Sequence, residues 1–231
     1  MNKRRIIITA GAKGGTGKTL TTTLVHGWLS EQSIRVTLID GDAENSTLSR
    51  FAPNSTFIDM HRPAALDEII LPLESDQADV VLLDSRAATS EDSISWLQQL
   101  GLRALQEELH TRVTIVTLVT HSRDTLEQLK RWTGTLKDEV DWIVVRNLVG
   151  GQVDEYDASN LRSAVLKKLR AAEITVPLIP PYVMANLEVH GLTVAAARVS
   201  PNISWANRRR CQSLYDLIGA QCDEARSHLL P

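Results

Sequence analysis

The sequence contains 231 residues, of which 43% are hydrophobic and 23% are charged, and its formal net charge at pH 7 is −3. This composition is ordinary for a globular protein with a substantial core and argues against a generally cationic nucleic-acid binder. The only cysteines, Cys211 and Cys222, form neither a disulfide framework nor a metal-ligand pattern. No apolar run approaches the ~18 residues of a membrane span. We therefore expect one cytoplasmic domain over residues 1–231, without membrane insertion.

Short β-branched segments alternate along the chain with longer segments of helical periodicity. Strands are predicted, in chain order, at Arg5–Thr9, Arg35–Asp40, Ala78–Asp84, Arg112–Thr120, Asp141–Asn147 and Ile174–Pro180. Helices are predicted at Gly17–Ser30, Ser90–His110, Arg123–Lys137, Asn160–Ala172 and Asn202–Glu224, and loops at Ser49–Pro63 and Val149–Ser159. Apolar strands that alternate with helices predict an α/β fold, with a mostly parallel twisted sheet covered by helices on both faces.

A glycine-rich stretch, AGAKGGTGKTLTTT at residues 10–23, joins the first predicted strand to the first predicted helix. This is the context of a phosphate-binding P-loop, in which glycines bring backbone N–H groups onto phosphate oxygens. Lys18 would supply charge to the phosphates and the Thr19 hydroxyl suits Mg²⁺. The first glycine of the ordinary pattern is replaced by Ala12. The predicted nucleotide-binding residues of this loop are Gly14, Gly15, Thr16, Gly17, Lys18, Thr19 and Leu20.

Carboxylates stand at the ends of two further predicted strands. The segment LIDGD places Asp40 at a strand end and Asp42 two residues later, and VVLLDS ends in Asp84. Carboxylates at the carboxyl edge of a parallel sheet can hold Mg²⁺ beside a P-loop, although such a residue also serves as a helix cap. Asp40, Asp84 and Thr19 are therefore the candidate metal-binding residues.

The segment KGGTGKT, Lys13 to Thr19, resembles the deviant Walker A motif K-G-G-x-G-K-T of the ParA/MinD family of P-loop ATPases. The resemblance implies a P-loop NTPase fold of the deviant Walker A subclass, with ATP and Mg²⁺ as cofactors. It also implies a homodimer that sandwiches two ATP molecules. Lys18 would then act within its own subunit, whereas Lys13 would reach the nucleotide of the partner. A solvated loop lysine is the alternative interpretation of Lys13.

Other segments extend this resemblance over most of the chain. DGDAENSTL is similar to the second family motif, D-x-D followed by N-A-T. By this resemblance Asp40 would lie near the metal, and Asp42 would position or activate the attacking water. Asp84 matches the Walker B aspartate. The same resemblance would place Asn45 and Thr47 in a nucleotide-sensing loop, Asn147 at the border of the adenine, and Pro180 and Pro181 in the base pocket. The implied catalytic residues are Lys13, Lys18 and Asp42.

The segment that follows Asp84 departs from the family pattern. It reads SRAATSE, residues 85–91, where the family commonly has a Pro-Pro or Gly-rich turn. This difference concerns the switch that senses the γ-phosphate and therefore the rate of hydrolysis. The ParA-like proteins of conjugative plasmids, such as TraL, resemble this sequence in that respect.

The resemblance implies an ATP-hydrolysing switch in plasmid partition or conjugative transfer, slow and stimulated by a regulatory partner protein. Relatives of this kind bind DNA non-specifically through basic residues. Two clusters are candidates here, Arg208–Arg210 in the last helix and Lys167, Lys168 and Arg170. Three successive arginines spread over about 200 degrees of a helix, so they cannot all face one way. A solvated helix surface is the alternative interpretation of both clusters.

Two other functions are compatible with the same core. A MinD-like positioning ATPase would act on a membrane or a protein complex, but the tail GAQCDEARSHLLP carries two acidic residues and one arginine, which disfavours anionic lipid. An ATP-dependent metabolic enzyme would need a shaped substrate pocket, for which the sequence shows no constellation. Iron proteins of the nitrogenase type carry the two-lysine loop but need cluster-ligating cysteines in mid-chain, which are absent from this sequence.

Overall fold

The computed structural model describes residues 3–11, 13–42, 47–60, 62–85 and 90–231. Its strands form one seven-stranded sheet in the order β3-β2-β4-β1-β5-β6-β7, and every pair of neighbours is parallel. The predicted α/β sheet is therefore confirmed, and it is wholly parallel in the described residues. The strands are β1 (Arg4–Ala10), β2 (Val36–Asp40), β3 (Thr56–Phe57), β4 (Val80–Asp84), β5 (Thr111–Val119), β6 (Asp141–Asn147) and β7 (Ala172–Val176).

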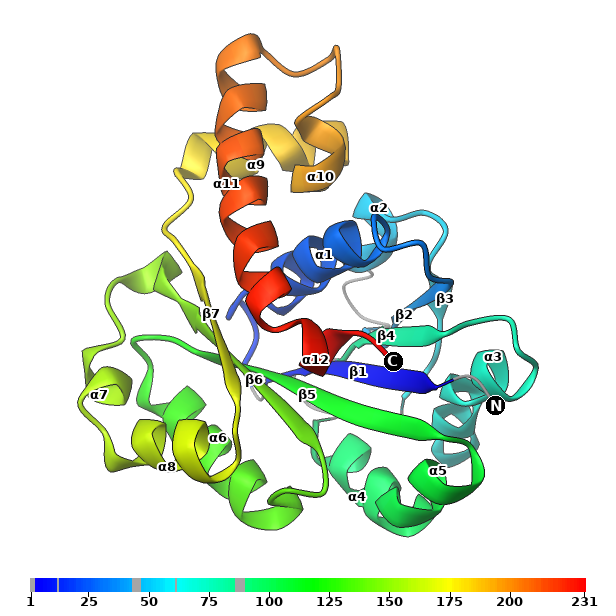
Figure 1. Ribbon diagram of the computed structural model, residues 1–231. Helices are drawn as coiled ribbons and strands as arrows, with labels where there is room; N and C mark the ends of the chain where they lie inside the picture. The colour runs from blue at the N-terminus through cyan, green and yellow to red at the C-terminus, as the bar shows by residue number, and fades with distance from the viewer. Residues whose placement is uncertain (1–2, 12, 43–46, 61, 86–89) are drawn as a thin grey trace.

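Helices cover both faces of this sheet (Figure 1). On one face lie α1 (Lys18–Leu29), α2 (Thr47–Phe51), α9 (Pro181–His190), α10 (Val194–Ala197) and α11 (Trp205–Glu224). The opposite face carries α3 (Leu71–Glu74), α4 (Ser90–Leu100), α5 (Leu102–Glu108), α6 (Arg123–Leu136) and α8 (Asn160–Lys168). The remaining short helices are α7 (Asp154–Asp157), α12 (Arg226–Leu229) and 3₁₀ helices at Pro63–Ile69 and Leu148–Gly150.

The alternation of side chains along the central strand divides the core in two. Ile7 of β1 is fully buried in a cluster with α1, α9 and α11, whereas Ile6 and Ile8 are fully buried in a second cluster under α4 and α5. A strand that is apolar on both faces can be covered by helices on both sides. This central position of β1 places the loop that follows it in the middle of the carboxyl edge of the sheet.

Three predicted elements are wrong in their extent. The helix predicted at Asn160–Ala172 ends at Lys168, since Arg170 has a positive φ of 54° and β7 begins at Ala172. The single helix predicted at Ser90–His110 is divided into α4 and α5 at Gly101, whose φ of 77° is unfavourable for other residues. The strand predicted at Ile174–Pro180 runs instead from Ala172 to Val176, because Pro177 has no N–H group for the ladder. Pro180 and Pro181 then begin α9, a helix that was not predicted.

Smaller differences occur where short elements were not foreseen. The segment expected to be the loop Ser49–Pro63 holds the end of α2 and the strand β3, and the loop expected at Val149–Ser159 holds α7. The helix predicted to start at Asn202 begins at Trp205, capped by the Ser204 hydroxyl, which accepts from the N–H of Asn207. Both cysteines are buried in this helix, on its inner face.

The C-terminal tail is fixed to the amino end of β1 by one buried arginine. Arg5 is 1% exposed and donates from Nε to the carbonyl of Leu230 at 2.7 Å and from an Nη to that of Ser227 at 3.0 Å. Its other Nη pairs with Asp141 at 2.5 Å and reaches the Thr114 hydroxyl at 2.6 Å. The tail is therefore packed into the fold. Among the described residues, no helix combines the length and the apolar character needed to cross a bilayer.

Candidate functional site

The glycine-rich loop leaves β1 after Ala10 and enters α1 at Lys18. Gly15 and Gly17 have φ of 73° and 92°, which L-residues rarely adopt, so glycine is needed at both positions. A Cβ on Gly17 would also lie 2.3 Å from Nδ2 of Asn147. Gly14 and Gly15 are exposed and open around their Cα atoms. This part of the loop can therefore approach a ligand closely through its backbone.

Lys18 lies over the loop that precedes it. Its ammonium group donates to the carbonyl of Lys13 at 3.1 Å, and the Thr16 hydroxyl donates to the same carbonyl at 3.1 Å. Burial lowers the pKa of Lys18, while the nearby carboxylates of Asp84 and Asp42 act in the opposite direction. Asp84 and Asp42 are thus close enough to Lys18 to influence its ionisation.

The sheet register brings the two strand-end carboxylates together. Asp84 lies opposite Asp40 on β2 and opposite Thr9 on β1, and the two aspartates are 3% and 1% exposed. The hydroxyl groups of Thr19 and Thr22 donate to Asp84, the latter at 3.1 Å. Burial and the charge of Asp40 raise the pKa of Asp84 to about 6, against the opposing effect of these hydroxyls and of Lys18. Two adjacent buried carboxylates repel one another unless a cation lies between or beside them.

Asp40 also organises the segment that follows it. Its carboxylate accepts from the backbone N–H of Asp42 at 3.0 Å and from that of Ser49 at 3.2 Å. The first contact turns the chain so that Asp42, which is half-buried, stays at the site. The structure therefore brings Lys18, Thr19, Asp40, Asp42 and Asp84 to one edge of the sheet.

This donor set fits a Mg²⁺ ion bound together with a nucleotide. In the described residues, no group of three or more His, Cys, Asp and Glu side chains could hold a metal ion alone. Asp84 and Thr19 would supply oxygen ligands directly or through water, and phosphate oxygens would complete the octahedron that Mg²⁺ prefers. The buried carboxylate pair is the observation that supports this assignment.

Lys13 is directed away from this carboxylate pair. Its side chain is 54% exposed, and its ammonium group lies 3.3 Å from the Ser122 hydroxyl and 3.5 Å from the carboxylate of Asp124. Both partners stand where β5 leads into α6. The two lysines of the motif thus serve different contacts, Lys18 within its own loop and Lys13 at the surface.

The residues predicted near the base lie around the P-loop but make contacts of their own. Asn147, at the end of β6, is 1% exposed, donates to the Thr16 carbonyl at 2.7 Å and accepts from the Val149 N–H at 3.2 Å. It therefore braces the loop, and its place beside an adenine stays a prediction. Pro180 and Pro181 stand at the start of α9. Thr19 and Leu20 line a cavity of about 120 Å³ between α1 and α9.

Two predicted switch segments lie partly outside the described residues. Asn45 and residues 86–89 belong to that part of the chain, and Thr47 is described only as the first residue of α2. Ser85 is buried and donates from its hydroxyl to the Thr9 carbonyl at 2.8 Å, which ties the start of SRAATSE to β1.

Three contributors to the site were not predicted from the sequence. Thr22 is one helical turn after Thr19, a spacing that puts both hydroxyls on one face of α1 and could have indicated its role. Ser122 and Asp124, which hold Lys13, carry no motif that could have identified them.

The predicted DNA-binding arginines differ from one another in their surroundings. Arg208 is half-buried and donates to the carbonyls of Ser200 and Ile203, so it holds the segment before α11. Arg209 and Arg210 are exposed. The second basic cluster, at the end of α8, lies far from the start of α11 (Figure 1). A continuous basic surface that includes both clusters is therefore absent from the described residues.

Comparisons with known proteins show the family of this chain. Residues 7–186 match the model of the CobQ/CobB/MinD/ParA nucleotide binding domain. Protein MobD of Acidithiobacillus ferrooxidans is 28% identical over 170 residues, which are 70% of this chain and 73% of MobD.

Two solved structures share the fold. The MinC:MinD cell division protein complex of Aquifex aeolicus superposes with a TM-score of 0.58 at 17% identity, covering 99% of this chain and 97% of that chain. The septum site-determining protein MinD complexed with Mg-ADP, from Pyrococcus horikoshii, gives a TM-score of 0.56 at 18% identity and covers 98% of both chains. The matched domain includes the P-loop and both strand-end carboxylates, and the chain therefore belongs to the CobQ/CobB/MinD/ParA family of nucleotide-binding proteins.

Proposed function

We propose that this protein is an ATP-hydrolysing switch that dimerises around ATP and Mg²⁺ and serves plasmid partition or conjugative transfer, with slow turnover that a partner protein stimulates. The observation that carries the proposal is the buried pair Asp40 and Asp84 beside Lys18 and Thr19. The family match supports nucleotide binding, and the MinD structure with Mg-ADP supports the cofactor pair.

Each residue has a role that follows from its position. The backbone of Gly14–Gly17 and the N-terminus of α1 would bind phosphate oxygens, and Lys18 would neutralise their charge. Mg²⁺ supplies charge neutralisation at the phosphates when it is bound. Asp84 and Asp40 would hold its coordination shell through Thr19 and water. Asp42, kept at the site by its N–H contact with Asp40, would orient the attacking water.

Lys13 would act across the dimer. Its contact with Asp124 is between two largely exposed groups, so it is worth about 1 kcal/mol or less and is readily exchanged for a stronger partner. A phosphate of the second subunit is such a partner, because a cation delivered in trans stabilises the charge that develops during phosphoryl transfer.

The decisive measurement is the molar mass in solution by light scattering with ADP, with ATP, and with ATP after Lys13→Ala. We expect a monomer with ADP, a dimer with ATP, and a monomer again for the Lys13→Ala variant, which should still bind ATP. Lys130→Ala, an exposed lysine on α6, is the matched control and should leave dimerisation intact. A protein that binds ATP without any change of mass would refute the dimer switch.

A MinD-like role at a membrane is less well supported by the structure. The C-terminal segment that such a role would use is held by Arg5 through the carbonyls of Ser227 and Leu230, and Leu229 is fully buried. Binding to acidic vesicles in ATP, measured by co-sedimentation, would reverse this preference.

A further inference from the structure

An open apolar groove runs along α11 and includes Pro180, one of the two prolines predicted for the base pocket. Its volume is about 580 Å³, and it lies between α11, α9 and the segment 177–180 that joins β7 to α9. The floor consists of core residues, among them Val183, Leu187 and Cys211, each 3% exposed or less. Figure 1 shows that α9, α10 and the first half of α11 project beyond the sheet as a helical lobe.

The rim of the groove is apolar and exposed. Leu178 is 61% exposed, Trp205 71% and Leu217 47%. One stripe of about 18 Å on α11 borders the groove, because its residues follow one another at four-residue intervals: Trp205, Arg209, Ser213 and Leu217. Exposed side chains of this size gathered around a groove mark an interaction surface, whereas apolar residues scattered singly do not.

The charged residues that line the groove indicate which kind of ligand it can bind. Its charged members are Arg209 and Arg210, and it contains no acidic residue. Arg210 stands over the exposed Tyr182 ring at 5.4 Å from its centroid, which holds the guanidinium at the mouth between α11 and α9. A ligand for this groove therefore needs apolar side chains for the rim and carboxylates for the two arginines.

We propose that the groove between α9 and α11 docks an acidic amphipathic helix of a partner protein. A helix fits because the stripe on α11 presents the four-residue spacing that a second helix matches by ridges-into-grooves packing. DNA fits less well, since nucleic-acid surfaces are polar and rich in phosphate contacts, whereas Arg208 is engaged with backbone carbonyls and the rim is apolar. This proposal specifies the chemistry of the partner protein that the proposed function requires. Its biological role rests on that proposed function, whereas the binding of the helix does not.

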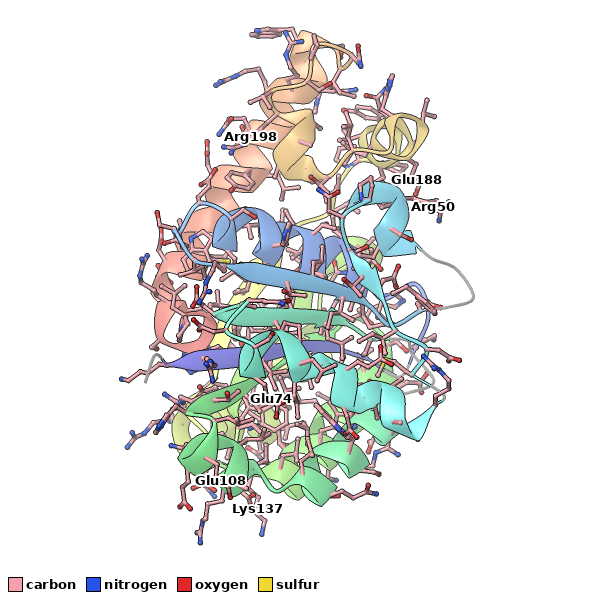
Figure 2. The ribbon with its side chains drawn as sticks, turned by 90° about the vertical axis from the view of Figure 1, so that its right-hand side faces the viewer. Arg50, Glu74, Glu108, Lys137, Glu188 and Arg198 are labelled. Atoms are coloured by element: carbon pink, nitrogen blue, oxygen red, sulfur yellow. The ribbon has the colours of Figure 1, made fainter. Side chains whose placement is uncertain are left out.

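The groove is separate from the contacts that join the helical lobe to the rest of the protein. Figure 2 shows Glu188 of α9 beside Arg50 of α2, and Gly191, which ends α9, lies close to the Arg50 carbonyl. Arg198 pairs with Glu31 of the segment after α1 and covers the Tyr215 ring at 3.9 Å. These contacts fix the lobe on the side of α1 and α2 through residues that do not line the groove.

The fluorescence of Trp205 provides a direct assay, because the other four tryptophans are each at most 5% exposed. The probe is a synthetic helical peptide of about 16 residues, with leucines on one face and glutamates beside them, a length that covers the stripe. A second peptide with lysine in place of glutamate is the charge control. We expect the acidic peptide to shift Trp205 emission to the blue and to protect it from acrylamide, and the lysine peptide to bind at least tenfold more weakly.

Variants of the rim complete the test. Arg209→Glu and Leu217→Asp should each weaken the acidic peptide about tenfold or more, whereas Val189→Asp, at an exposed valine of α9 outside the groove, should leave its affinity unchanged. All three positions are exposed, and thermal melts followed by circular dichroism check that the variants fold.

Three results would overturn the proposal. The first is that the two peptides bind equally, or that neither binds. The second is that duplex DNA or acidic vesicles, and not the peptide, protect Trp205 from acrylamide. The third is that Trp205 becomes protected when the protein alone is concentrated and its molar mass doubles. The titration is performed without nucleotide and with ATP, so a defective nucleotide switch and an unoccupied groove give different outcomes.

Discussion

Replacement of Asp84 by asparagine should stabilise the protein without ligand while it removes Mg²⁺-dependent nucleotide binding. Asp84 is 3% exposed beside Asp40, and these surroundings raise its pKa from 3.8 to about 6. Because the folded protein holds this proton more tightly than the unfolded chain does, ionisation of Asp84 lowers stability as the pH rises from about 4 to about 6. Above pH 6 the full cost applies.

The size of the effect follows from the shift. About two pKa units correspond to ~3 kcal/mol. This shift already includes the attraction of Lys18 and the hydrogen bonds from Thr19 and Thr22. Asparagine avoids the cost, but its amide N–H₂ group brings a further donor into a site where these three side chains already donate, which takes back part of the gain. We therefore expect a net gain of about 1–2 kcal/mol at pH 7.5, or a rise of a few degrees in Tm for a chain of this length. At pH 4 the gain should disappear.

Urea denaturation without nucleotide or Mg²⁺, at pH 4 and at pH 7.5, measures this difference. Asp79→Asn is the control of opposite sign, since hydrogen bonding to Arg35 lowers the pKa of Asp79 and its removal should reduce stability at neutral pH. Binding of a fluorescent ADP analogue, measured with Mg²⁺ and with EDTA, tests whether the variant has lost Mg²⁺-dependent nucleotide binding. An Asp84→Asn variant less stable than wild type at pH 7.5, or equally shifted at both pH values, would refute the reasoning.

Three further predictions concern the loop, the tail and the cysteines. Gly17→Ala should lose nucleotide binding and about 2 kcal/mol of stability, since the residue has φ 92° and its Cβ would meet Asn147. Adding Asn147→Ser should relieve the collision but not the backbone strain. Calorimetric titration of nucleotide and thermal melts measure the two effects. Arg5→Met should cost about 3 kcal/mol in urea denaturation, because the carbonyls of Ser227 and Leu230 lose their charged donor, whereas Asp141 keeps its pair with Arg112. Cys222, whose thiol pKa burial raises to about 12, and the buried Cys211 should resist thiol reagents at pH 8 until the protein unfolds, and reaction at the rate of a free thiol would contradict this.

The grouping of the candidate-site residues at the carboxyl edge of the sheet was predictable because its signals are local. The P-loop residues are adjacent in sequence, and Asp40 and Asp84 end apolar strands, so a parallel sheet brings them to one edge whatever the strand order. The strand register adds what the sequence could not state, that Asp40 and Asp84 are direct neighbours. The contact between Asn147 and Thr16 joins residues 131 positions apart and has no local signal.

The groove was not predictable because its residues are scattered and one of its helices was missed. Pro180 was predicted as the last residue of a strand and Pro181 only as part of the base pocket, whereas proline is also favourable at the first position of a helix, here α9. The spread of Arg208–Arg210 around α11 was foreseen, but only the carbonyls of Ser200 and Ile203 decide that Arg208 turns inward. Surface function in this lobe depends on tertiary contacts rather than on motifs.

The two ends of β1 have opposite effects on stability, and this arrangement can be tested with a double variant. At the carboxyl end the buried Asp84 carboxylate lowers stability when it is ionised, and at the amino end Arg5 binds four partners in a buried site. Arg5 and Thr9, the neighbour of Asp84, are about 13 Å apart along the strand. At that distance the effects of Arg5→Met and Asp84→Asn should add to within about 0.5 kcal/mol, so the double variant should recover roughly half of the stability that Arg5→Met loses. Agreement would mean that the contacts of the tail offset the cost of the functional site without being part of it. A coupling above about 1 kcal/mol in urea denaturation would show instead that the tail and the site communicate through the central strand.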